Sequence, residues 1–130
     1  MKIRGFLGAV ALLMCPFFMA HGQEHTVAHQ WNEQLLEAIR NDFARPTVHA
    51  RNLYHASILM YDSWAAYDVS QAKTIFLGQT FDGYTCPFDS AALAIPSEDA
   101  DIKEAQEVAM SYATYRLIRH RYEASPQAES

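Results

Sequence analysis

The middle of the sequence carries three polar residues whose spacing favours one face of a helix. Arg51, His55 and Asp62 would lie within an arc of about 40° on a helix, inside an otherwise apolar stretch. His55 and Asp62 are seven residues apart, which is roughly 10.5 Å along a helix axis and too far to chelate one ion. One hypothesis is a polar network that lines a site between helices. The other, which we favour, is a structural network that fixes helix packing, because paired polar groups in cores usually serve structure.

A second candidate pair lies near the end of the sequence. Arg116 and His120 are four residues apart and share a helix face. We hypothesise that they meet Asp62 or His55 of the earlier helix. The equally weighted alternative is that both lie past the packed region and extend into water along their apolar stems.

A third set has the spacing of metal ligands. His25 and His29 are four residues apart, and Glu33 and Glu37 share a face with His29. That face lies opposite the apolar one, so we favour solvated polar residues over a metal site. The sequence has no glycine-rich phosphate loop, zinc-type cysteine spacing, nucleophile elbow or His-Glu-x-x-His motif. We therefore expect no cofactor to be bound by this chain alone.

The elements that position these residues are three predicted helices. The first runs from about 26 to 43 with Thr26 as its N-cap, and the second runs from Pro46 to about 67. The third begins with Ser97 as its N-cap, is acidic in its first turn and basic in its last, and ends before Pro126. Its predicted buried stripe consists of Ile102, Ala105, Val108, Ala109, Tyr112, Ala113 and Leu117.

The connection 69–96 lacks helical periodicity and is rich in aromatic residues, so we expect it to pack onto something, with a short hairpin at Asp82-Gly83. The second helix is apolar on nearly every side, which is typical of a helix covered by several neighbours. The sequence therefore predicts an all-α fold of three main helices and one long connection, forming part of a helical bundle larger than this chain can build.

The N-terminal residues 1–22 are typical of a secretory signal peptide. Lys2 and Arg4 precede an apolar stretch of 15 residues at 6–20, which is shorter than the roughly 20 residues of a membrane span. We weighed a retained anchor and a lipidated Cys15 and favour cleavage after Gly22. The predicted mature domain is then 23–130, exported to the periplasm or the extracellular space, with no membrane attachment.

The composition excludes two further classes of protein, nucleic-acid binders and disordered chains. The 130 residues include 10 Lys+Arg and 15 Asp+Glu, for a net charge of −5, so no basic face for nucleic acid can be assembled. Half of the residues are hydrophobic, which is too many for a disordered chain. Loss of the signal peptide would leave Cys86 as the single cysteine of 23–130, either free or paired outside this stretch.

Four runs of sequence together carry a resemblance to a known family. They are 27–33, 41–55, 60–68 and 111–121, which include Asn41-Asp42-Phe43-Ala44-Arg45-Pro46, Met60-Tyr61-Asp62-Ser63-Trp64 and Tyr115-Arg116-Leu117-Ile118-Arg119-His120. This pattern resembles the N-terminal helical region of bacterial exported proteins similar to vanadium-dependent haloperoxidases, in the type-2 phosphatidic acid phosphatase superfamily. The resemblance implies a helical bundle. Its enzymes hold vanadate or phosphate and oxidise halides with peroxide, or hydrolyse phosphate esters.

The motifs by which that family binds its oxyanion are missing from this sequence. Arg45-Pro46 imitates the end of Lys-x6-Arg-Pro, but Ala38 stands where the lysine would be. Arg116 and His120 have three residues between them, whereas the family's Arg-x4-His has four. No catalytic residue is therefore carried over, and vanadate would belong to a longer parent protein.

The resulting hypothesis is a partial N-terminal segment of an exported haloperoxidase-like or acid phosphatase-like protein, inactive by itself. Its expected partner is the remainder of a longer polypeptide or another helical surface. One alternative is a complete small secreted helical module that binds a partner through 69–96. The other is a small metal-binding protein that uses His25, His29 and Glu33.

Overall fold

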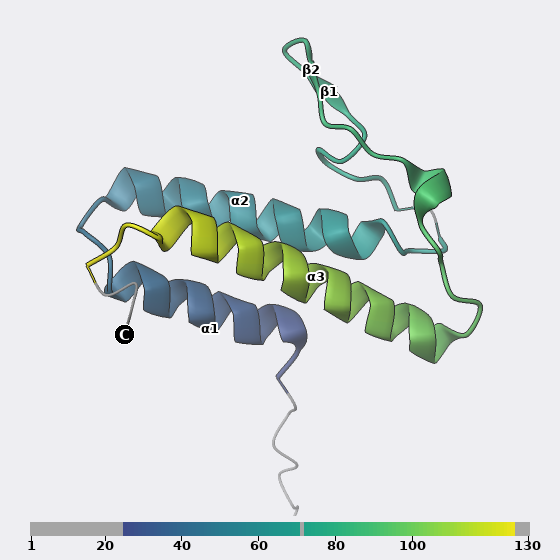
Figure 1. Cartoon of the computed structure of the whole chain (residues 1–130), viewed down its shortest axis with the longest axis horizontal. Helices are drawn as coiled ribbons and strands as arrows, with labels where there is room; N and C mark the ends of the chain where they lie inside the picture. The colour runs from purple at the N-terminus through teal and green to yellow at the C-terminus, as the bar shows by residue number, and fades with distance from the viewer. Residues whose placement is uncertain (1–24, 71, 127–130) are drawn as a thin grey trace, which may run out of the picture.

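The computed structural model describes residues 25–70 and 72–126, and its main elements are three helices (Figure 1). Helix α1 spans Val27–Arg40, α2 spans Pro46–Ala65 and α3 spans Asp99–Tyr122. Between α2 and α3 lie strands β1 (Thr80–Phe81) and β2 (Tyr84–Thr85) and a short 3-10 helix (Ser90–Ala92). The all-α class, the three helices and the long connection are confirmed. The predicted signal peptide lies outside the described residues.

The helix boundaries follow from local chemistry. Thr26 caps α1, because its hydroxyl accepts a hydrogen bond from the backbone N–H of His29 at 3.2 Å. Pro46 occupies the first position of α2, as expected for a residue without an N–H group. The N-cap predicted at Ser97 is wrong by one residue: Glu98 precedes α3, and its side chain makes no capping bond.

Helix α3 packs against both α2 and α1, whereas α1 and α2 have much less contact with each other. Figure 1 shows α3 running between the other two helices. Within the described residues, α3 is therefore the helix that contacts both of the others extensively. Helix α2 leaves Leu53, Tyr54 and Tyr61 exposed along one side.

The three helices meet in a small core. Leu35 of α1, Ala56 of α2 and Tyr122 of α3 are buried together, and half-buried apolar side chains surround them. The buried hydroxyl of Tyr122 accepts a hydrogen bond from the side-chain amide of Asn52 at 3.2 Å. Farther along, Ile58, Met60 and Ala65 of α2 and Ile102 of α3 are also buried. None of the helices in 25–70 and 72–126 is both long and apolar enough to cross a membrane.

The hairpin predicted at Asp82-Gly83 is confirmed. Strands β1 and β2 pair antiparallel, with Thr80 opposite Thr85 and Phe81 opposite Tyr84. Asp82 has a φ of 48° and Gly83 a φ of 80°, as a two-residue turn with two left-handed residues requires. Figure 1 shows the hairpin standing away from the three helices.

Candidate functional site

Asp62 is the most deeply buried charged residue of the set that the sequence singled out. Its carboxylate accepts hydrogen bonds from three successive backbone N–H groups: Ile75 at 2.6 Å, Phe76 at 2.8 Å and Leu77 at 2.9 Å. Only 6% of Asp62 is exposed. Successive N–H groups that converge in this way form an anion-binding nest, and here the anion is a side chain of the same protein.

The neighbouring residue extends this attachment. The Tyr61 hydroxyl donates to the backbone carbonyl of Lys73 at 3.1 Å. Two adjacent residues at the end of α2 therefore fasten segment 73–77, which leads into the hairpin. We call the bonds from Tyr61 and Asp62 to this segment the Asp62 clasp. Asp62 therefore anchors a loop segment, and both of its carboxylate oxygens accept from backbone donors and not from another helix.

His55 does not join Asp62 in a network. Its Nδ1 atom lies 3.3 Å from a guanidinium nitrogen of Arg121 on α3. Burial, followed by the charges of Arg121 and Arg51, lowers the pKa of His55 below its ordinary value. Arg51 itself is exposed. The three residues that share a face of α2 thus have separate roles. Asp62 anchors a loop, His55 contacts α3, and Arg51 is a surface cation.

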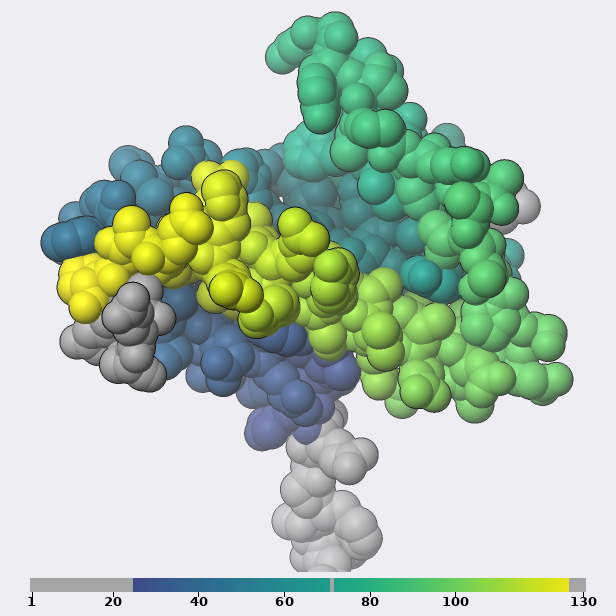
Figure 2. All heavy atoms as spheres, viewed as in Figure 1, coloured from purple at the N-terminus to yellow at the C-terminus, as the bar shows by residue number. Residues whose placement is uncertain are grey.

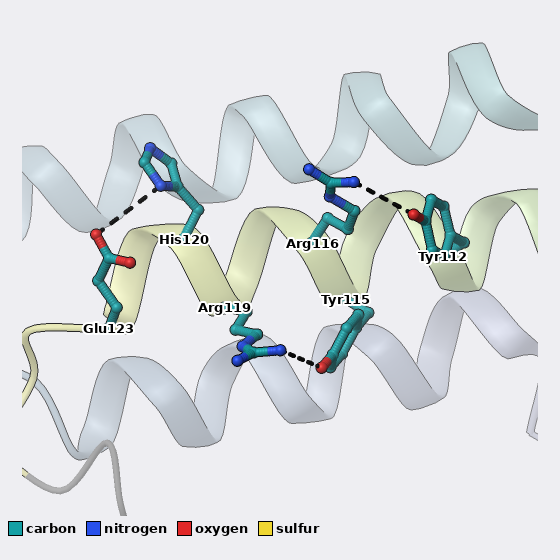
Figure 3. A pocket seen from close by; sticks show the side chains of 6 residues that line it. All are labelled: Tyr112, Tyr115, Arg116, Arg119, His120 and Glu123. Carbon is teal, nitrogen blue, oxygen red and sulfur yellow. Dashed lines mark hydrogen bonds and ion pairs between the residues drawn. The ribbon is translucent and has the colours of Figure 1, made fainter.

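Arg116 and His120 also do not reach Asp62 or His55. Arg116 lies over the ring of Tyr112 and donates to its hydroxyl at 3.2 Å, and His120 lies 3.9 Å from a carboxylate oxygen of Glu123 (Figure 3). Both residues are exposed, as the alternative interpretation anticipated. The predicted contact of Arg116 and His120 with α2 is not formed. Arg121, the residue after His120, contacts His55 instead.

A second arginine–tyrosine pair lies beside the first on the same helix. Arg119 donates to the Tyr115 hydroxyl at 3.0 Å. Figure 3 shows the two pairs on opposite flanks of α3, Arg116 with Tyr112 on one and Arg119 with Tyr115 on the other. The shallow depression around them encloses about 390 Å³. Because the cations diverge and engage their own tyrosines, they do not fit around an oxyanion such as vanadate or phosphate.

The metal hypothesis is not supported by the arrangement of its ligands. The rings of His25 and His29 stack with their centroids 4.2 Å apart, and both residues are exposed, as is Glu33. Within the described residues, no group of three or more His, Cys, Asp or Glu side chains is arranged to hold a metal ion. Cys86 is half-buried, with a free thiol in this part of the chain.

A further polar cluster, which the sequence did not indicate, closes the turn between α1 and α2. Asp42 accepts from Arg45 at 2.8 Å and from the Ser125 hydroxyl at 2.9 Å, and a ring nitrogen of His49 lies 2.9 Å from the carbonyl of Phe43. Burial alone would raise the pKa of Asp42, but the hydrogen bonds that its carboxylate accepts from Arg45, the backbone of Phe43 and Ser125 outweigh it and lower that pKa. Because Ser125 bonds the carboxylate and not the imidazole, the cluster is not a nucleophile–base arrangement.

The surface of α3 between and beside the arginine–tyrosine pairs exposes large apolar and aromatic side chains. Val108, Tyr112 and Tyr115 are 60%, 62% and 47% exposed, although the sequence predicts Val108 and Tyr112 to be buried. The residues of α3 that are buried are Ile102, Thr114 and Tyr122, and Tyr122 lies seven residues after Tyr115, on the same side of the helix. Figure 2 shows side chains of α3 at the surface along the helix, with no other segment over them in that view.

Helix α1 borders this surface and turns it into a groove. Val27 and Trp31 of α1 line this shallow groove, which is open to solvent, together with Val108, Tyr112 and Tyr115 of α3. We call the exposed residues Val108, Tyr112, Tyr115, Arg116 and Arg119 the outer face of α3. Sequence reasoning missed this face because apolar residues occur on several sides of the helix, so periodicity alone could not choose the buried side.

The chain matches no protein-family model, no curated protein and no solved structure. What can be said of its function therefore rests on the sequence resemblance and on the geometry of the described residues.

Proposed function

We propose that this chain is an exported, haloperoxidase-like helical segment whose function is assembly: the outer face of α3 packs against a further helical surface. No step of halide oxidation or phosphate-ester hydrolysis is assigned to it. The all-α fold is consistent with the bundle that the resemblance implies. The observation that carries the proposal is the uncovered outer face of α3.

The composition of that face supports a protein interface. Among the described residues, seven hydrophobic residues are buried whereas twelve large hydrophobic residues are exposed. On α3 the exposed ones lie at positions 108, 112 and 115, which form one stripe of a helix. Tyrosine and arginine are among the residues that most often dominate binding energy in protein interfaces, and both occur on this face.

Geometry also favours a helix as the occupant. A docked helix recognises an apolar groove through residues spaced three and four apart, and the groove between α1 and α3 presents apolar residues at that spacing. Val27 and Trp31 are four apart on α1, as are Val108 and Tyr112 on α3. Ridges of side chains at these spacings pack into the grooves of a second helix.

Hydroxyl-radical footprinting of the protein isolated from its host tests the assembly. Tyr54 of α2 is 57% exposed, lies on neither candidate surface and serves as an internal reference. We expect Tyr112 and Tyr115 to be modified several-fold more slowly than Tyr54. Equal modification of the three tyrosines would overturn the proposal.

The coding sequence tests the family part of the proposal separately. We expect the reading frame beyond codon 130, or an adjacent gene, to encode the Lys-x6-Arg-Pro and Arg-x4-His motifs of that family. If neither encodes them, the relation to haloperoxidases is wrong, whatever the footprint shows.

A binding role for the connection 69–96 is the second candidate, and one observation favours it. Phe81 and Tyr84 are 50% and 71% exposed on a hairpin that the Asp62 clasp holds in place. The same footprint separates the two candidates. Protection of Phe81 and Tyr84, with Tyr112 modified freely, would favour this hairpin as the contact surface.

A further inference from the structure

Two arginines and a histidine come together where the start of α2 lies beside the end of α3 (Figure 1). Arg51 and His55 are four residues apart on α2 and therefore share one face of that helix. A guanidinium nitrogen of Arg121 on α3 lies 3.3 Å from Nδ1 of His55. We call Arg51, His55 and Arg121 the cationic cluster. None of them belongs to the outer face of α3, and their role is independent of the proposed assembly.

A buried hydrogen bond fixes the level at which the two helices meet here. Asn52 follows Arg51 and Tyr122 follows Arg121 in the sequence, and the Asn52 amide donates to the Tyr122 hydroxyl at 3.2 Å. Both of these residues are buried, whereas the two arginines are exposed. The backbones that carry the arginines are thus held in place while their donors face solvent, which is a pre-organised arrangement for binding.

The contact between Arg121 and His55 also shows which form of the imidazole is present. A guanidinium group can only donate hydrogen bonds, so Nδ1 of His55 accepts this one and carries no proton. Burial, followed by the charges of Arg121 and Arg51, lowers the pKa of His55, in agreement with a neutral ring. His55 therefore accepts from a donor of Arg121 that an anion could use instead.

No carboxylate of the described residues balances the charge of the cluster. In the stretches 25–70 and 72–126, the ion pairs formed by acidic side chains involve other cations and never Arg51, His55 or Arg121. Positive charges that lie close together on two packed helices repel each other. An anion held between the two arginines would convert this repulsion into attraction.

We propose that the cationic cluster binds a small doubly charged oxyanion, such as sulfate or phosphate, and takes up a proton with it. The guanidinium groups of Arg51 and Arg121 offer paired N–H donors that match the oxygen atoms of such an anion, and two arginines match its double charge. As the anion binds, Nδ1 of His55 takes a proton from solvent, releases Arg121 and becomes a further donor. Binding and protonation favour each other, because the anion offsets the added positive charge.

Titration of the full chain with sodium sulfate, followed by NMR at constant ionic strength, tests this site. Sulfate keeps its double charge between about pH 5.5 and 7.5, so a change of affinity over this range arises from the protein. We expect saturable binding with a dissociation constant of about 1 mM at the lower pH, and several-fold weaker binding at the higher pH. Absence of saturable binding at both pH values would overturn the proposal.

Substitution of the arginines tests whether the site is defined or diffuse. Arg51→Gln and Arg121→Gln should each weaken sulfate binding about tenfold, because each removes paired donors and one charge. Arg40→Gln removes an exposed arginine of α1 and is the matched control, whose dissociation constant should be unchanged. Equal weakening in all three variants would mean attraction to the overall charge and would overturn the site. Thermal unfolding of each variant distinguishes lost binding from a lost fold.

The variant His55→Gln separates proton uptake from binding. Glutamine can form hydrogen bonds but cannot take up a proton, so this variant should bind sulfate with the same affinity at both pH values. In the wild type, the ¹⁵N signal of Nδ1 should show the proton arriving as sulfate is added. An equal pH dependence in His55→Gln and the wild type would refute the proton uptake at His55.

Sodium acetate tests the class of ligand. At about pH 7.5 acetate is fully ionised but carries a single charge, so it should bind several-fold more weakly than sulfate. Acetate that binds as tightly as sulfate would overturn the assignment to a doubly charged anion.

Discussion

The Asp62 clasp and the outer face of α3 show opposite relations between side-chain chemistry and burial. Asp62 carries a charge into the interior, and three backbone N–H groups of the following segment satisfy it. The outer face carries apolar and aromatic side chains into the solvent, and no described segment covers them. A buried charge is stable only with its partners in place, whereas exposed apolar residues become favourable when another surface covers them.

We expect the largest loss of stability on substitution at Asp62. Asp62→Ala leaves three backbone donors without their acceptor and should lower the free energy of unfolding by about 3 kcal/mol. Chemical denaturation measures this change. Asp89→Ala, which removes one exposed bond to the N–H of Ala91, is the matched control and should cost no more than about 1 kcal/mol. Equal losses in the two variants would contradict the structural role of the clasp.

The hairpin that the clasp positions should be the next most sensitive. Gly83 has a φ of 80°, so Gly83→Val should lower the free energy of unfolding by roughly 1–2 kcal/mol. Nothing lies within 4 Å of a Cβ built at Gly83, so the cost comes from backbone conformation and not from a clash. Gly83→Asn should cost clearly less, because asparagine tolerates the left-handed region. Thermal unfolding that shows the reverse order would be inconsistent with this turn.

Polar substitution on the outer face of α3 should barely change the stability of the isolated chain. Val108→Ser/Tyr112→Ser removes no buried contact, so the free energy of unfolding, measured by chemical denaturation, should stay within about 0.5 kcal/mol of the wild-type value. A loss of several kcal/mol would mean that Val108 and Tyr112 are buried, as the sequence predicts.

The smallest expected effect is the pH response of His55. Because burial, Arg121 and Arg51 lower the pKa of His55 in the folded protein, the unfolded chain binds more protons near the ordinary value of about 6.5. The stability linked to His55 is therefore complete above that pH and is lost as the pH falls through the folded-state pKa. Denaturation at pH 7.5 and at pH 5.5 should show this loss in the wild type and a smaller loss in His55→Gln. A loss of the same size in both proteins would exclude His55 as its source.

The sequence alone determined the three helices, the hairpin and the starts of the first two helices. The cap at Thr26, the start of α2 at Pro46 and the turn at Asp82-Gly83 were all predicted correctly, whereas α1 and α2 end two to three residues before their predicted ends. Each depends on interactions between residues a few positions apart, which the sequence displays directly. The N-cap of α3 failed because Ser97, Glu98 and Asp99 offer competing starts, and local preference does not choose among them.

Only the tertiary structure decided which partner each polar residue meets and which side of α3 is buried. The sequence singled out Asp62 but suggested partners on other helices, whereas its partners are backbone groups 13 to 15 residues later. It placed Val108 and Tyr112 in the core, because a helix with apolar residues on several sides has no unique inner face until its neighbours are placed. Local spacing fixes an element, but the packing of elements distant in sequence fixes what each side chain contacts.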